Sequence, residues 1–143
     1  MEFEPHATML EQKGDGYVVA SLGEDSGYVP YTSFSAKKSY LESNPEVVQA
    51  FTDALQKGMD YVQSHSPEEI AAVIAPQFAE TDMETLTRIV ARYYEQDTWK
   101  DNLIFEEDSF DLLQNILDMS GVLKEKVPYE ELVNTEFAQK AKK

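Results

Sequence analysis

The strand-like segments of the sequence constrain the fold most strongly, because they are confined to the first 36 residues. Residues 16–22 (GYVVASL) are β-branched and apolar enough for a buried strand, and residues 31–36 (YTSFSA) alternate as a second strand does. Residues 2–10 (EFEPHATML) have the pattern of a strand end that runs into a short helix, which Gly14 ends. Two or three strands cannot satisfy both sheet edges or bury both faces. We therefore interpret this region as part of a sheet whose other strands lie outside the chain.

The remainder of the chain contains the start and stop signals of successive helices. Asn44 and Pro45 form a cap and a first-turn proline, and apolar residues from Val47 to Val62 follow at helical spacing, which predicts one buried stripe. Residues 66–69 and 81–84 are capping boxes, and each precedes an apolar helical face. A further helix stops at Gly121, and a turn and a short helix follow. The predicted fold class is α/β, with few strands at the N-terminal end followed by mostly α-helices.

Charge and composition exclude several function classes. The net charge is −15, with 27 acidic residues against 12 Lys and Arg, so nucleic acid is not expected as a partner. The same charge disfavours an anionic membrane surface. Hydrophobic residues make up 42% of the chain, which is enough for a core. The chain has no cysteine and therefore no disulfide, thiol nucleophile or thiolate metal site.

No motif of catalysis or cofactor binding is present in the sequence. It contains no phosphate loop, no dinucleotide glycine fingerprint and no Gly-x-Ser-x-Gly, so we expect no enzyme, no catalytic residue and no cofactor. The two histidines lack metal-ligand spacing, and the acidic residues 105–111 lack the alternating ligands and mid-loop glycine of a calcium loop. No metal site is expected, and residues 105–111 are interpreted as the charged first turn of a helix.

The order of these motifs resembles solute-binding proteins of bacterial ABC importers. Residues 3–30 and 35–78 resemble the second half of the group that handles nitrate, alkanesulfonates, taurine and thiamine-pyrimidine precursors. In that group an aromatic-acid-Pro step ends a strand and opens a helix, and here it stands as Phe3-Glu4-Pro5, with Phe3 where Trp is commoner. Helices that begin Asn-Pro-Glu and Ser-Pro-Glu follow in order. The resemblance covers nearly the whole chain but about half of the family's length.

The resemblance implies a fold and an organisation. It implies a periplasmic-binding-protein type II unit, incomplete here, in which two lobes enclose a ligand. Residues 1–22 would be the terminal strand-helix-strand piece of the second lobe. Residues 23–30 would cross between the lobes, and residues 31–143 would be the C-terminal, mainly helical part of the first lobe. Gly23, Ser26 and Gly27 could absorb rotation when the lobes close.

The resemblance also implies a function and partners. The intact protein would capture a small organic or nitrogen- or sulfur-containing nutrient and deliver it to ABC permease subunits without transforming it. Its other partner would be the missing N-terminal half of the same protein. The intact protein would be exported, as a periplasmic protein or a cell-surface lipoprotein, although the chain as given has no basic and apolar segments of a signal. One branch of the family makes a thiamine pyrimidine through a cysteine-rich motif, which this chain lacks.

Three candidate ligand-binding residues lie at the aromatic-acid-Pro step. Glu4 would accept hydrogen bonds from a ligand amine or ring N–H, or it would be a helix-start carboxylate stabilised by the dipole. Phe3 would stack on a planar or apolar part of the ligand, or it would be core. His6 would make a hydrogen bond at the edge of the cleft.

Three further candidates lie in or beside the expected crossing. Tyr28 and Tyr31 flank Pro30 and would either close over a ligand or cover the interface between lobes. Ser26 would be a polar ligand contact. A different class of function stays open at this point, a free-standing acidic helical interaction module that adds its front strands to a partner's sheet.

Overall fold

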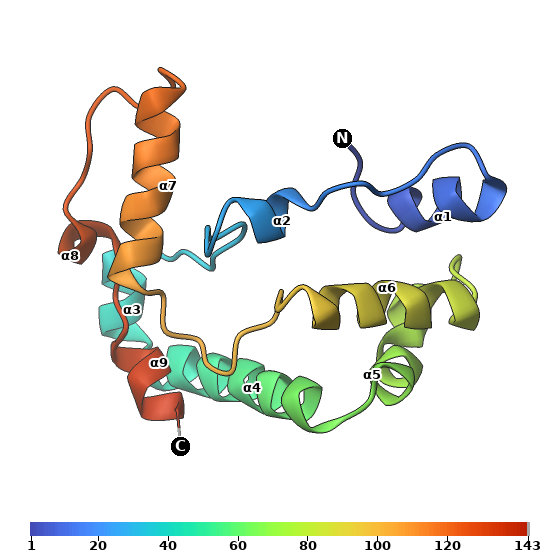
Figure 1. Ribbon diagram of the computed structural model, residues 1–143. Helices are drawn as coiled ribbons and strands as arrows, with labels where there is room; N and C mark the ends of the chain where they lie inside the picture. The colour runs from blue at the N-terminus through green and yellow to red at the C-terminus, as the bar shows by residue number, and fades with distance from the viewer. Residues whose placement is uncertain (143) are drawn as a thin grey trace. The chain divides into compact units, whose positions relative to one another are not determined.

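The computed structural model describes residues 1–142, and helices account for its regular secondary structure (Figure 1). The order of elements is α1 (His6–Lys13), α2 (Leu22–Asp25), α3 (Lys38–Ser43), α4 (Pro45–Ser64), α5 (Pro67–Ile74), the 3-10 helix η1 (Ala75–Gln77), α6 (Met83–Glu95), α7 (Glu107–Met119), α8 (Tyr129–Leu132) and α9 (Glu136–Ala141). The helices predicted after residue 44 are therefore present.

The strands predicted for residues 16–22 and 31–36 are not confirmed. Residues 16–21 and 31–36 have no strand assignment, and no strand occurs elsewhere in residues 1–142. A strand exists only where a neighbour completes its backbone hydrogen bonds, and neither segment has such a neighbour. Leu22 begins the helical turn α2, so the first residues of the expected crossing, 23–25, are helical.

The described residues divide into two compact units. The first unit comprises Met1–Asp25 and Met59–Asp101, and the second comprises Ser26–Gly58 and the residues from Asn102 onward. Helix α4 supplies residues to both units. Each unit is described by itself.

The core of the first unit lies between α5 and α6. Ile70 and Ala71 of α5 pack with Leu86 and Val90 of α6, and each of these four side chains is at most 3% exposed. Partly buried neighbours complete this cluster, among them Trp99. The apolar face predicted for α6 is therefore the face that is buried.

The cap predicted for the start of α5 is confirmed, whereas the cap of α6 is one residue from the predicted position. Ser66 accepts a hydrogen bond from the Glu69 amide, and Glu69 accepts one from the Ser66 amide, as a capping box requires. The cap of α6 is Asp82 rather than Thr81, because the Asp82 carboxylate accepts the amide of Thr85 at 2.9 Å. The expected capping box was therefore one residue out of register.

The second unit has an aromatic cluster around Phe110 of α7. The Phe110 ring is in edge-to-face contact with Phe105 and Tyr129, and Phe110 is 7% exposed. The Gln114 amide also ties α7 to a later segment, because it donates to the Val127 carbonyl and accepts from the Val127 amide. Glu107 and Asp108 form the acidic first turn of α7, as the sequence predicted.

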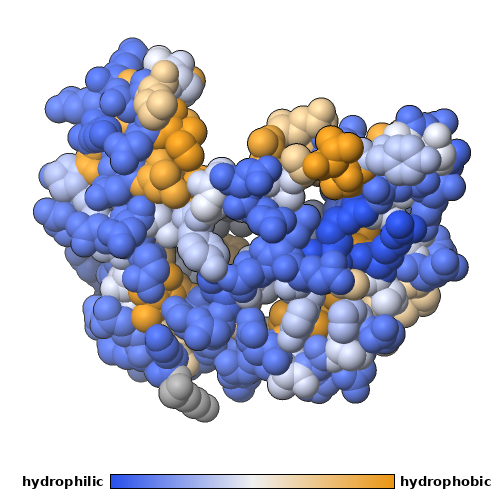
Figure 2. All heavy atoms as spheres, viewed as in Figure 1, coloured by the Kyte–Doolittle hydropathy of each residue, from blue (hydrophilic) through white to orange (hydrophobic). Residues whose placement is uncertain are grey.

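The apolar stripe predicted for α4 is less buried than expected. Val47 is 57% exposed and Phe51 is 46% exposed, although Phe51 contacts the Phe34 ring edge-to-face. Most residues on the face drawn in Figure 2 are hydrophilic, with apolar side chains gathered in separate patches. Although α4 is 20 residues long, no helix within residues 1–142 combines the length and the apolarity that a membrane span requires.

Candidate functional site

The aromatic-acid-Pro step lies directly before α1, and Glu4 is bonded to that helix. Its carboxylate accepts from the amide and from the hydroxyl of Thr8, each at 3.0 Å. Thr8 is fully buried. A carboxylate that accepts a first-turn amide is favoured by the helix dipole. Glu4 therefore has the structural role that the sequence left open as an alternative.

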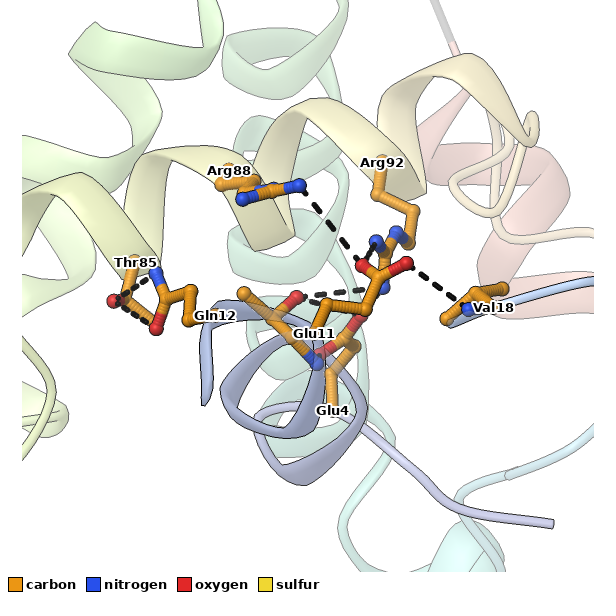
Figure 3. Close-up of polar contacts among 8 residues, drawn as sticks. Glu4, Glu11, Gln12, Val18, Thr85, Arg88 and Arg92 are labelled. Atoms are coloured by element: carbon orange, nitrogen blue, oxygen red, sulfur yellow. Dashed lines mark hydrogen bonds and ion pairs between the residues drawn. The ribbon is translucent and has the colours of Figure 1, made fainter. Parts of the chain in front are cut away.

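Arg92 of α6 joins Glu4 to the rest of the first unit (Figure 3). Its Nη1 donates to Glu4 Oε1 at 2.5 Å, and its Nη2 donates to Glu11 Oε2. The three side chains are 6% (Glu4), 15% (Glu11) and 19% (Arg92) exposed. Charge-assisted hydrogen bonds of this kind are stronger than neutral ones, and partial removal from water reduces their screening.

Glu11 has further partners that stabilise its charged form. It accepts the amide of Val18 at 3.0 Å, and Arg88 lies 4.0 Å from its Oε2. The Val18 amide, followed by Arg92, holds the pKa of Glu11 below its ordinary value. Partial burial by itself would lower the pKa of Arg92, but hydrogen bonds to Glu11 and Glu4 outweigh it, so that pKa is raised.

A second polar connection joins α1 to the start of α6. Gln12 Nε2 donates to Thr85 Oγ1 at 2.9 Å (Figure 3). Thr85 Oγ1 in turn donates to Asp82 Oδ2 at 2.8 Å. The Thr85 amide and hydroxyl lower the pKa of Asp82. Polar side chains thus hold α1 against α6 at two places along the helix.

Phe3 and His6 flank Glu4 and are more accessible than it is. Phe3 is 55% exposed, and the His6 side chain is 70% exposed, with its Nδ1 4.0 Å from Glu2 Oε1. Both residues therefore offer surface to a ligand. Within the described residues, Phe3 is therefore not a buried core residue.

The other three candidates belong to the second unit. Tyr28 is 62% exposed, Tyr31 is 82% exposed, and Ser26 is also exposed. Gly27, which lies between Ser26 and Tyr28, has a φ of +78°. A residue with a side chain adopts this backbone conformation only at a cost in free energy. The structure thus places the six predicted residues on two short segments, one in each unit.

Two hollows of the described chain lie away from these six residues. A groove of about 450 Å³ in the second unit lies between the start of α4 and α9 and includes Gln49, Phe137 and Lys140. A smaller hollow of about 60 Å³ in the first unit is bounded by Tyr94 and Trp99 among others. Neither is lined by one of the six candidate ligand-binding residues. Within residues 1–142, no group of three or more His, Asp or Glu side chains is arranged to hold a metal ion.

The sequence analysis missed Arg92 and Glu11, although two signals pointed to them. Glu4 and Glu11 are seven residues apart, which is two helical turns and therefore one face. Arg88 and Arg92 are four residues apart in a chain with few cations, so they share a face of their own helix. Two carboxylates on one face and two guanidiniums on another are the expected halves of an ion-pair network.

Comparison with known proteins agrees with the resemblance. Residues 6–70 match the family model described as NMT1/THI5 like, a family with a periplasmic-binding-protein-like architecture. A Bacillus subtilis (strain 168) protein named "Putative binding protein YtlA" is 42% identical over 138 residues, which are 96% of this chain. The chain spans 41% of that relative's length. No solved structure matches the chain significantly.

The two matches confirm the resemblance to solute-binding proteins of ABC importers, because they reach it from a family model and from a whole relative. The chain is therefore similar to the putative binding protein YtlA, and its residues 6–70 match the NMT1/THI5-like family model.

Proposed function

We propose that the chain is part of the substrate-binding component of an ABC importer. In this role it helps to capture a small organic or nitrogen- or sulfur-containing nutrient for delivery to permease subunits, and it performs no catalysis. The observation that carries the proposal is the 42% identity to a binding protein over nearly the whole chain. The same identity does not favour a free-standing interaction module. The intact protein is then exported, to the periplasm or the cell surface.

The proposed ligand edge is the segment that precedes α1. The exposed ring of Phe3 packs on an apolar or planar part of the ligand, and His6 makes a hydrogen bond to it. Glu4 Oε1 is taken by Arg92 and Thr8, whereas Oε2 accepts only the Thr8 amide. A carboxylate oxygen has two acceptor positions, so Glu4 Oε2 can take one N–H of a ligand.

The proposed crossing supplies further ligand contacts. Residues 1–22 belong to the second lobe, residues 23–30 cross between the lobes, and residues 31–143 belong to the first lobe. Ser26, Tyr28 and Tyr31 then contact the ligand from the crossing and its end. The positive φ of Gly27 supports a hinge there, because glycine adopts other backbone conformations without steric cost.

A chimera with the relative tests the proposal. The segment of YtlA that aligns with this chain is replaced by residues 1–143, and thermal unfolding is followed with nitrate, taurine, ethanesulfonate or a thiamine-pyrimidine precursor. A compound that binds the folded state raises the melting temperature by mass action. We expect one compound to raise the melting temperature of both YtlA and the chimera.

Matched variants locate the binding residues within the chimera. Phe3→Ala should weaken binding of that compound by roughly tenfold, which is about 1.4 kcal/mol. Tyr17→Ala is the control, because Tyr17 is 81% exposed and lies outside the proposed site. A compound that stabilises YtlA but not the chimera would contradict the proposal for this chain. If none of the four stabilises YtlA either, the proposed ligand class is wrong.

A further inference from the structure

We infer that Arg92 is the positioning residue of the proposed ligand edge, and that its charge makes this edge favour uncharged ligand groups over ammonium groups. The inference rests on the proposed function, since it concerns the same edge. It assigns a role to a residue of α6 that lies more than eighty positions from Glu4 in the chain.

The guanidinium of Arg92 contacts α1 at both of its ends. At the start of the helix it donates to Glu4 Oε1 at 2.5 Å and lies 3.3 Å from Thr8 Oγ1. Two turns further along, it donates to Glu11 Oε2. Because the guanidinium is planar and its donors are fixed, two anchor points define the rotation of α1 as well as its distance.

Apolar packing does not provide an alternative anchor for α1. Thr8 is its only buried residue, and the apolar residues Met9 and Leu10 are 39% and 41% exposed. The side chains that hydrogen-bond to α6 from α1 and the step before it are polar ones, Glu4, Thr8, Glu11 and Gln12. Loss of Arg92 would leave the Gln12–Thr85 hydrogen bond and the longer 4.0 Å approach of Arg88 to Glu11, because the other contacts end on Arg92.

The same contacts determine the charge that a ligand meets. An isolated carboxylate at Glu4 would attract an ammonium group, because opposite charges a few ångströms apart attract strongly outside bulk water. Here Arg92, which is shared with Glu11, offsets the charge of Glu4 with help from Arg88 beside Glu11, and a ligand ammonium at Glu4 would also lie close to the Arg92 cation. The remaining acceptor at Oε2 suits a neutral N–H.

The positioning part is tested on the 143-residue chain by amide hydrogen exchange. The reporter is the Thr8 amide, which donates to Glu4 Oε2. Arg92→Met should reduce its protection by at least tenfold, while Arg88→Met should change it less than twofold. Arg88 is the matched control because it lies one turn away, is 54% exposed and approaches only Glu11 at 4.0 Å. Unchanged protection in Arg92→Met would overturn the positioning role.

If Arg92→Met does not fold, a more conservative substitution provides the test. Arg92→Lys keeps the charge but cannot reach both carboxylates with a planar fork. We expect it to fold and to protect the Thr8 amide to an intermediate extent. Full protection in Arg92→Lys would show that the two-point contact is not needed, which would overturn the inference.

The charge preference is tested in the YtlA chimera with two probes. Taurine and ethanesulfonate share a sulfonate, but only taurine carries an ammonium group. Arg92→Gln should raise the affinity for taurine relative to ethanesulfonate by about tenfold, because Glu4 is then left with its charge. A purely structural role would weaken both probes equally and leave the ratio unchanged, which would overturn the charge preference.

Failure of the proposed function gives a different pattern. If neither probe binds the unsubstituted chimera, the sulfonate ligand class is wrong and so is the charge preference inferred for it. The exchange of the Thr8 amide still decides whether Arg92 positions the edge, because that measurement needs no ligand.

Discussion

The two units of the chain connect distant segments by different chemistry. In the first unit Arg92 joins α1 to α6 through charged hydrogen bonds to Glu4 and Glu11. In the second unit Gln114 joins α7 to Val127 through neutral hydrogen bonds, beside the aromatic cluster of Phe110. Charged connections weaken when salt is added, whereas neutral and apolar ones do not. We therefore expect salt to weaken the connection between α1 and α6, beside the proposed ligand edge, more than the connection at Gln114.

The largest expected effect is on the aromatic cluster of the second unit. Phe110→Ala removes a ring that is 7% exposed and in contact with two other rings. We expect a loss of about 3–5 kcal/mol in the free energy of unfolding, measured in urea. Met119→Ala is the control, because Met119 lies on the same helix and is 88% exposed. A loss similar to that of the control would show that this cluster is not a core.

The next effect is on the charged connection of the first unit. Arg92→Met leaves the carboxylates of Glu4 and Glu11 without their shared cation. The expected loss is about 1.5–3 kcal/mol, the range for hydrogen bonds to charged groups. It should shrink in 1 M salt, where screening weakens the attraction in the parent chain. A loss that is independent of salt would indicate that Arg92 contributes by packing alone.

A smaller effect is expected for the neutral connection of the second unit. Gln114→Ala removes the two hydrogen bonds to Val127, and each is worth about 0.5–1.5 kcal/mol. A total loss of about 1–3 kcal/mol should therefore appear in urea unfolding. Unlike the loss in Arg92→Met, it should be the same at low and high salt. Dependence on salt here would remove the contrast between the units.

The smallest effects concern pH, where the two units should respond at opposite ends of the scale. The pKa of Glu11 is lowered from 4.5, so its contribution to stability is present above pH 4.5 and is lost as the pH falls through the folded-state value. Burial, then Glu106 and Glu107, raises the pKa of Tyr129 from 10.0, so that contribution is present below pH 10.0 and is lost at higher pH.

Two variants separate these responses. Glu11→Gln should flatten part of the acid limb of the stability profile and leave the alkaline limb unchanged. Tyr129→Phe should do the reverse, because it removes the phenol whose hydroxyl donates to the Phe105 carbonyl. Both effects should be small, since water reaches these groups and screens their charges. If Glu11→Gln altered only the alkaline limb, the assignment of the acid response to the first unit would be wrong.

The helical part of the fold could be predicted from the sequence because its signals are local. The proline at the start of α4, the Ser66 capping box and the apolar face of α6 each act within a few residues. The strand predictions at residues 16–22 and 31–36 depended on partners outside those segments, and β-branched sequence alone does not supply a neighbouring strand. The exposure of Val47 on α4 could not be predicted from spacing for a similar reason.

The candidate site could be predicted only in part for the same physical reason. The sequence placed Glu4 at the start of a helix, where the Thr8 amide binds it. It did not identify Arg92 as the partner, because that contact joins positions 88 residues apart and depends on how α1 packs on α6. Local pattern identifies the carboxylate, and tertiary packing decides whether it is available to a ligand.

The measurement that most directly tests the account is a double-mutant cycle of Glu4→Gln and Arg92→Met, read as free energies of unfolding in the 143-residue chain. If Arg92 holds Glu4, the two losses should not add, and the coupling should be about 0.5–3 kcal/mol. Losses that add to within about 0.3–0.5 kcal/mol would contradict the account, because Glu4 would then be independent of Arg92.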